Sequence, residues 1–313
     1  MRVLFVSSAN SSQGINPIVL RQQNSLIKKG ISIENFFING RGIRGFVKNK
    51  IRLSRKLKQN QFDIMHVHYG LWGLLLPLNC KEKKIVSLMG SDIFKSNILR
   101  LLIKFFSTHF WDQTIVKSPK MKETLRFEHA KVIPNGVSFE LFKPMDKIEA
   151  RRFLKLEENK KYILFVSVFH RANPSKNIAL AKKAVDLIKN NDIELLQIYD
   201  VRDNEMKYYY AASDLLLMTS RYEGSPNAIK EAMACNLPIV STDVGDVKEV
   251  IKNTEGCFIA SFDPDDVANK INMAIEFGEK TNGRENIRHL EESVIADKII
   301  DVYATCLKNK NNN

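Results

Sequence analysis

The sequence predicts an α/β protein of two domains, each built on a parallel sheet. Short apolar runs of strand length alternate with longer amphipathic segments through the first half of the chain, and the same alternation begins again at Tyr162. The length of 313 residues favours two domains of roughly 150 residues each. Both observations indicate crossover units, in which a helix joins two parallel strands.

Composition sets the class of protein. Hydrophobic residues make up 44% of the chain and charged residues 27%, as is usual for folded soluble proteins. No apolar run reaches the roughly 18 residues of a membrane span, and the apolar start is too short for a signal peptide. The four cysteines lack metal-ligand or redox spacing, so we expect reduced thiols and a cytoplasmic protein.

Positive charge is concentrated in the first half. Residues 1–145 contain 24 Lys and Arg against 8 Asp and Glu, and Arg41–Lys58 has eight basic residues and no acid. Apolar residues at helical spacing make this segment a basic amphipathic helix suited to an anionic membrane surface, which would place the protein peripherally on the inner face of the membrane. A solvated face without a partner is the alternative. No nucleic-acid motif accompanies it, so we expect no nucleic-acid partner. Ile98–Phe106 is a second candidate membrane surface, with a core helix as its alternative.

The first domain reads as alternating strands and helices. Strands are predicted at Val3–Val6, Ile31–Ile38, Phe62–His68, Ile85–Leu88, Thr114–Ser118 and Lys131–Ile133. Asn16 caps and Pro17 starts a helix that runs to Lys29. Ligands of open parallel sheets bind beyond the carboxyl ends of the strands. The residues predicted there are Gly14, His68, Tyr69, Gly90 and Asp92. A turn role for Gly14 and a structural role for His68 are the alternatives.

The second domain restarts the pattern after a hinge. Asn135-Gly136 is a turn signal and Lys143-Pro144 precedes a new charged helix, so we place the boundary after residue 142. The strand Tyr162–Val168 is followed by a loop with Arg171 and Lys176. Two cations beside a helix start suit a diphosphate leaving group, and solvated loop charges are the alternative.

Residues 213–240 form the central unit of the second domain. Leu215–Met218 is a buried strand, Thr219–Gly224 a polar turn, and Pro238–Val240 the start of the next strand. Between them Ser225 is predicted to cap a helix, with Pro226 at its first position. Glu223 and Glu231 bracket the helix start, whose free N–H groups attract anions. A nucleotide sugar fits this pattern, and two solvated glutamates are the alternative.

The motifs resemble those of a known family. Glu223-Gly-Ser-Pro-Asn followed by Lys230-Glu231-Ala-Met-Ala is similar to the Glu-x7-Glu element of retaining GT-B glycosyltransferases of the family 4 type. The resemblance implies that Glu223 lies against the donor sugar and that Glu231 binds the ribose. The loop of Gly224, Ser225, Pro226 and Asn227 would touch sugar and diphosphate. Arg171 and Lys176 resemble the Arg-x4-Lys pair that holds the diphosphate, and the Gly14 loop would face it.

The family implies a GT-B fold of two Rossmann-like domains facing a central cleft. Residues 1–142 would be the acceptor and membrane-facing domain, 143–292 the nucleotide-sugar-binding domain, and 293–313 a helix crossing back to the first domain plus a tail. The reaction would retain anomeric configuration, without metal or cofactor, and would move a sugar from a UDP- or GDP-sugar to a glycan or lipid-linked acceptor. Bacterial surface polysaccharide or glycolipid synthesis is the expected setting.

The chain departs from the family at two positions. Met89-Gly90 stands where the family commonly has His-Gly, so any histidine role there is lost or passes to His68. Asp246 replaces the usual second glycine after Gly245. An epimerase acting on nucleotide sugars and an inactive nucleotide-sugar-binding subunit are the alternative functions. A dehydrogenase is disfavoured because no Gly-x-Gly-x-x-Gly follows either first strand.

Overall fold

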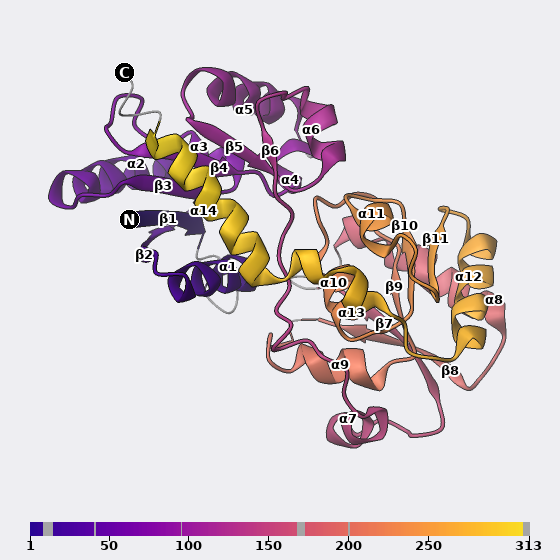
Figure 1. Cartoon of the computed structure of the whole chain (residues 1–313). Coiled ribbons are helices and arrows are strands. Elements are labelled where there is room, and N and C mark those ends of the chain that lie inside the picture. The colour runs from indigo at the N-terminus through magenta and orange to yellow at the C-terminus, as the bar shows by residue number, and fades with distance from the viewer. Residues whose placement is uncertain (9–14, 41, 95, 168–172, 200, 309–313) are drawn as a thin grey trace. The chain divides into compact units, whose positions relative to one another are not determined.

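The computed structural model describes residues 1–8, 15–40, 42–94, 96–167, 173–199 and 201–308. They form two compact α/β units, residues 1–135 with the C-terminal segment from Glu292, and residues 136–291 (Figure 1). The first boundary therefore falls earlier than residue 142. Arg284 explains this, because its guanidinium donates to the carbonyl oxygens of Phe139 (2.9 Å) and Phe142 (2.7 Å) and fastens the segment to the second unit.

The first unit contains a six-stranded parallel sheet. The strand order is β2-β1-β3-β4-β5-β6. The strands are β1 (Arg2–Ser8), β2 (Ser32–Ile38), β3 (Ile64–His68), β4 (Lys83–Ser87), β5 (Gln113–Val116) and β6 (Lys131–Val132). The alternation of apolar runs thus predicted each strand of this sheet to within about two residues, as expected for fully buried parallel strands.

Helices cover both faces of this sheet. On one face α2 (Gly42–Gln59), α5 (Asn97–His109) and α6 (Pro119–Leu125) send Leu53, Ile103 and Met121 into one core with Leu4 and Val6 of β1. Two short helices, α3 (Gly70–Gly73) and α4 (Ser91–Phe94), follow β3 and β4.

The opposite face is covered by α1 (Pro17–Lys28) and α14 (Glu292–Lys308), which pack against each other (Figure 1). The predicted cap of α1 is confirmed, since Asn16 Oδ1 accepts the N–H of Ile18 at 2.9 Å and Pro17 starts the helix. Ser25 donates to the carbonyl oxygen of Glu292 (2.8 Å), and Lys29 pairs with Asp297 (2.8 Å). The last helix therefore belongs to the first unit, although it follows the second along the chain.

The second unit contains a five-stranded parallel sheet in the order β11-β10-β9-β7-β8. The strands are β7 (Lys161–Val166), β8 (Ile193–Ile198), β9 (Leu215–Met218), β10 (Ile239–Thr242) and β11 (Cys257–Ala260). The helices are α7 (Lys147–Leu154), α8 (Ile178–Ile188), α9 (Met206–Ala212), α10 (Asn227–Ala234), α11 (Val247–Ile251), α12 (Pro264–Phe277) and α13 (Gly283–Asn286), with 3₁₀ turns η1 (Pro174–Lys176) and η2 (Arg288–Leu290). No described helix is both long and apolar enough to span a bilayer.

Candidate functional site

The loop between β9 and α10 lies at the carboxyl edge of the second sheet. Thr242, the last residue of β10, donates its hydroxyl to the carbonyl oxygen of Ser220 at 2.7 Å and ties the loop to the neighbouring strand. Gly245 supports the loop from the turn after β10. Its φ is +62°, and a Cβ there would lie 2.8 Å from the carbonyl oxygen of Gly224. Only glycine fits this close approach.

Lys176 and Glu223, distant in sequence, meet at this edge. The Lys176 ammonium lies 2.7 Å from Glu223 Oε1, and Ser220 donates to the same oxygen at 2.9 Å. Both side chains are about one-fifth exposed. Thr219 holds η1 in place by donating to the carbonyl oxygens of Lys176 and Asn177, both at 3.0 Å. The structure thus brings together two predicted site residues. Arg171 lies outside the described residues.

The start of α10 differs from the predicted one. Pro226 occupies the cap position, the helix begins at Asn227, and no side chain caps this end. The Ser225 hydroxyl donates instead to Asp246 Oδ2 at 2.6 Å. The prediction of Ser225 as the cap was therefore wrong, because a buried carboxylate takes its hydroxyl. Among the described residues no side chain caps the N–H groups of the first turn, and they keep their attraction for an anion.

A buried ion pair beneath this loop was missed by sequence reasoning. Lys230 Nζ lies 3.0 Å from Asp246 Oδ2, and their side chains are 0% and 6% exposed. Burial lowers the pKa of the Lys230 ammonium, and the Asp246 carboxylate acts in the opposite direction. The departure from the family pattern at Asp246 was the available signal, but its partner could not be identified from spacing.

Glu231 is held more deeply than Glu223. Its side chain faces the core side of α10, is 7% exposed and accepts the Tyr210 hydroxyl at 2.7 Å. Tyr210, from α9, is itself buried. The Glu-x7-Glu spacing therefore places one carboxylate in a partly exposed ion pair and the other in a buried hydrogen bond.

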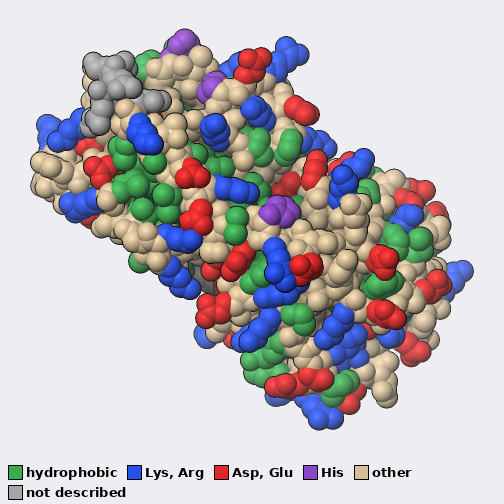
Figure 2. Space-filling model, in the orientation of Figure 1, with side chains coloured by type: hydrophobic (Ala, Val, Ile, Leu, Met, Phe, Trp, Pro, Cys, Tyr) green, Lys and Arg blue, Asp and Glu red, His purple; other side chains and the backbone are tan. Residues whose placement is uncertain are grey.

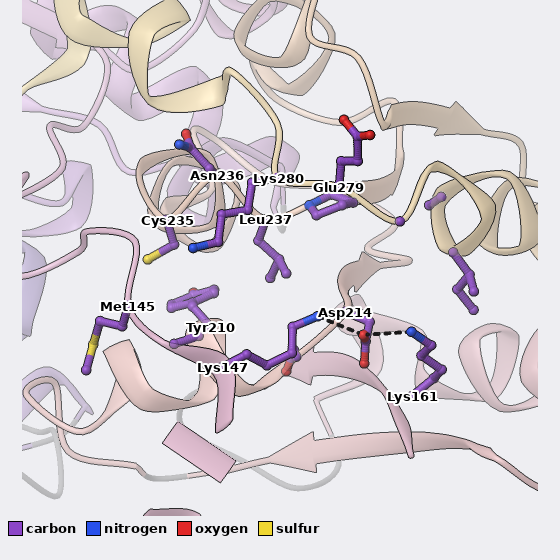
Figure 3. A pocket seen from close by; sticks show the side chains of 16 residues that line it. Met145, Lys147, Lys161, Tyr210, Asp214, Cys235, Asn236, Leu237, Glu279 and Lys280 are labelled. Atoms are coloured by element: carbon purple, nitrogen blue, oxygen red, sulfur yellow. Dashed lines mark hydrogen bonds and ion pairs between the residues drawn. The ribbon is translucent and has the colours of Figure 1, made fainter. Parts of the chain in front are cut away.

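Tyr210 also lines a separate cavity at the opposite edge of the second sheet (Figure 3). The cavity of about 210 Å³ lies beside the residues that precede β9 and β10. In it, Asp214 pairs with Lys147 at 2.9 Å and Lys161 at 3.6 Å. Because these residues lie at the amino ends of the strands, this cavity is distinct from the loop that carries Glu223.

In the first unit the residues predicted for the acceptor side lie at the carboxyl ends of β3 and β4. They are His68, Tyr69, Gly90 and Asp92. Asp92 is fully buried, and its carboxylate accepts the N–H groups of Gly70 (2.8 Å), Gly90 (2.8 Å) and Met89 (3.1 Å). Burial raises the pKa of Asp92, against these hydrogen bonds, which lower it. Asp92 therefore ties together the two segments that contain Tyr69 and Gly90. Gly14 lies outside the described residues.

The two histidines of β3 are buried. His66 forms hydrogen bonds with Tyr303 (2.6 Å) and Ser87 (2.8 Å), and His68 stacks on His66. Within the part of the chain that the structure describes, neither ring nitrogen of His68 has a hydrogen-bond partner. Burial, with a smaller effect of the Lys117 charge, lowers the pKa of His68 to about 3. His68 is thus a neutral imidazole near pH 7, and a base with so low a pKa is poorly matched to proton transfer there.

Two family models match the chain. Glycosyl transferases group 1 matches residues 160–276, and Glycosyltransferase Family 4 matches residues 18–141. Together they span most of the two units.

Curated relatives and solved structures agree with these matches. The chain is 22% identical to N-acetyl-alpha-D-glucosaminyl L-malate synthase of Bacillus anthracis, over 81% of this chain and 76% of that protein. It is 25% identical to UDP-Gal:alpha-D-GlcNAc-diphosphoundecaprenol alpha-1,3-galactosyltransferase of Escherichia coli, over 84% and 81%.

Two solved structures share the fold over nearly their full lengths. Sucrose-phosphate synthase from Thermosynechococcus elongatus superposes with a TM-score of 0.85 at 17% identity, covering 99% of this chain and 100% of that one. HepE of Anabaena, in complex with UDP and glucose, gives 0.77 at 17% identity, covering 97% and 100%.

Proposed function

The chain belongs to the glycosyltransferases of group 1 and family 4 and has their GT-B fold, and we propose that it moves a sugar from a nucleoside diphosphate sugar to an acceptor hydroxyl with retention of configuration. The acceptor oxygen bonds to the anomeric carbon on the same face from which the diphosphate departs, as that carbon's bond to the diphosphate breaks. The nucleoside diphosphate leaves and its phosphate oxygen takes up the proton of the acceptor hydroxyl.

The observation that carries this proposal is the meeting of Lys176, Glu223 and the uncapped start of α10 at one sheet edge. Lys176 and the N–H groups of the first turn would stabilise the charge that develops on the leaving diphosphate. Glu223 would accept hydrogen bonds from donor sugar hydroxyls, and Glu231 from the ribose. Arg171 lies outside the described residues and stays a predicted second cation for the diphosphate. With cations as the proposed partners of the leaving group, we propose that no divalent metal or cofactor is needed.

The donor would be a UDP-sugar rather than a GDP-sugar. HepE has been solved with UDP-glucose and with UDP, and the Escherichia coli relative is named for UDP-Gal. The acceptor would be a glycan or lipid-linked sugar of bacterial surface polysaccharide synthesis, since the same relative acts on a diphosphoundecaprenol acceptor.

A lipid-linked acceptor requires access to a membrane face, and α2 supplies a matching surface. It contains seven basic residues and no acid, and Ile43, Val47 and Ile51 on it are at least about half exposed. Figure 2 shows Lys and Arg side chains at the end of the first unit that carries α2. We propose that this helix rests on anionic lipid, which would make the protein peripheral on the inner face of the membrane.

A thermal-shift screen against UDP, GDP and their sugars tests the donor site, because a ligand that binds the folded state raises the midpoint. Turnover of the stabilising donor is then compared between wild type, Lys176→Ala and the matched control Lys182→Ala on the exposed side of α8. We expect Lys176→Ala to lose on the order of 3 kcal/mol of transition-state stabilisation, roughly 100-fold in rate, and the control to keep its rate. Equal rates for the two variants, or sugar isomerised without an acceptor, would contradict the proposal.

A further inference from the structure

The Lys230–Asp246 pair beneath the β9–α10 loop is not explained by stability. The free energy needed to remove two charges from water is about as large as the free energy gained from their attraction. Apolar residues of similar size would therefore stabilise the core at least as much. The chain nevertheless buries both charges almost completely. A buried pair of this kind is better explained by what it fixes in place.

The pair joins three segments of the second unit. Lys230 projects from α10, Asp246 comes from the turn after β10, and Ser225 belongs to the loop between β9 and α10. Ser225 donates to Asp246 Oδ2 at 2.6 Å, and the Lys230 ammonium contacts the same hydroxyl. The loop is thus tied through Ser225 to two elements that are themselves packed in the core.

The Asp246 side chain bonds Lys230 and Ser225 and does not cap the helix that follows it. It occupies the cap position of α11, where aspartate ordinarily accepts a backbone N–H, yet its side chain makes no capping bond. Its φ of −109° is open to any residue, so the family's glycine is not needed for the backbone here. The preceding Gly245 touches the carbonyl of Gly224, so both residues of this turn support the loop.

We propose that Lys230 and Asp246 are positioning residues for the donor-binding loop. Resting on the proposed function, this inference assigns them no contact with the donor. They hold Ser225, and through it they set the backbone of residues 223–227, the direction of the first N–H groups of α10 and the placement of Glu223 beside Lys176. The pair is neutral as a whole, so it fixes the loop without cancelling the positive potential of the helix start.

The test compares Lys230→Met with a matched control, Arg151→Met. Arg151 also forms a buried ion pair in the second unit, 2.8 Å from Asp214, with side chains 4% and 8% exposed. Asp214 precedes β9, at the sheet edge opposite the loop. Ser225→Ala is a third variant, which keeps both charges of the ion pair and removes the Ser225 hydroxyl that joins it to the loop. For each protein, amide hydrogen exchange of residues 223–227, the dissociation constant for UDP and the unfolding midpoint are measured.

We expect both ion-pair variants to unfold at lower temperature. Only Lys230→Met and Ser225→Ala should speed amide exchange in the loop, by about tenfold or more, and weaken UDP binding or donor kcat/KM, by up to about 100-fold. If amide exchange of residues 223–227 is as slow in Lys230→Met and Ser225→Ala as in Arg151→Met, the positioning role is overturned. The proposed function is left in place by that result. Failure of the wild type to bind UDP or any nucleotide sugar would overturn the proposed function, and the exchange measurement would still decide whether the pair holds the loop.

Discussion

At the scale of single residues, the two glutamates of the Glu-x7-Glu element differ in what holds them. Glu223 is in an ion pair with Lys176, and about one-fifth of each side chain remains exposed. Glu231 is buried and accepts the Tyr210 hydroxyl. We therefore expect a ligand to reach Glu223 and compete with Lys176 for it, whereas the Glu231 carboxylate is already held in place by Tyr210.

Tyr210→Phe tests this arrangement. Removing the hydroxyl takes a donor from a buried carboxylate, which should lower the free energy of unfolding by about 1–3 kcal/mol and weaken UDP binding several-fold. Denaturant unfolding and calorimetric titration measure the two effects. Tyr209→Phe, on the same helix, is the control, and similar losses in both variants would refute a specific role for the Tyr210–Glu231 bond.

His68 gives a prediction for acid stability. Its folded pKa of about 3 lies below the ordinary 6.5, so between these values the unfolded chain binds a proton that the folded protein does not. The free energy of unfolding therefore falls by about 1.4 kcal/mol for each pH unit as the pH is lowered from 6.5 towards 3. His68→Phe should remove this contribution to the pH dependence of stability. Denaturant unfolding at pH 6.5 and pH 5 should show a loss about 2 kcal/mol smaller in the variant than in wild type, and an equal loss would contradict the prediction.

At the scale of elements, α5 combines a core face with an exposed apolar face. Ile103 and Ser107 are buried, whereas Ile98 (74%), Leu101 (66%) and Phe105 (51%) are exposed. The core-helix interpretation is thus confirmed for one side of α5, and the membrane-surface interpretation stays a prediction for the exposed side. Because α2 and α5 pack on the same face of the sheet, we propose that α5 extends the membrane-binding surface proposed for α2.

Leu101→Glu with Phe105→Glu should weaken binding to vesicles containing anionic phospholipid by about tenfold or more, because apolar insertion is lost and negative charge is added. The unfolding midpoint should stay near that of wild type, since both side chains are exposed. Co-sedimentation measures the binding. Met273→Glu, on the exposed side of α12, is the control. Unchanged binding in the α5 variant, or after neutralising Lys48–Lys58, would remove the corresponding helix from the proposed surface.

At the scale of the whole molecule, the chain leaves the first unit, forms the second and returns. Helix α14 buries Ile295, Ile299 and Tyr303 in the first unit. The Tyr303 hydroxyl forms a hydrogen bond with His66 of β3. The first unit is therefore incomplete without α14, whereas residues 136–291 contain their own core.

Truncation after Glu291 should thus unfold the first unit and spare the second. Deleting α14 exposes to water the large apolar area that the helix covers. At roughly 25 cal/mol per Å², the burial free energy that is lost exceeds the free energy of unfolding of a marginally stable domain. Hydrogen exchange of the truncated chain should show lost protection in residues 1–135 and retained protection in 136–291. Retained protection in both segments would contradict the dependence on α14, and the isolated segment 136–291 should fold and bind UDP in the same assay.

The sequence by itself determined the local structure of this protein. Apolar runs set β9 to the residue, and Asn16-Pro17 set the start of α1. These features depend on neighbours within a few residues, where period, capping and backbone preference act. Only the tertiary structure decided that Lys176 meets Glu223, that Ser225 serves Asp246 rather than α10, and that Lys230 is buried. Those contacts join segments far apart in the chain, and which partner a polar side chain finds depends on how the elements pack around it.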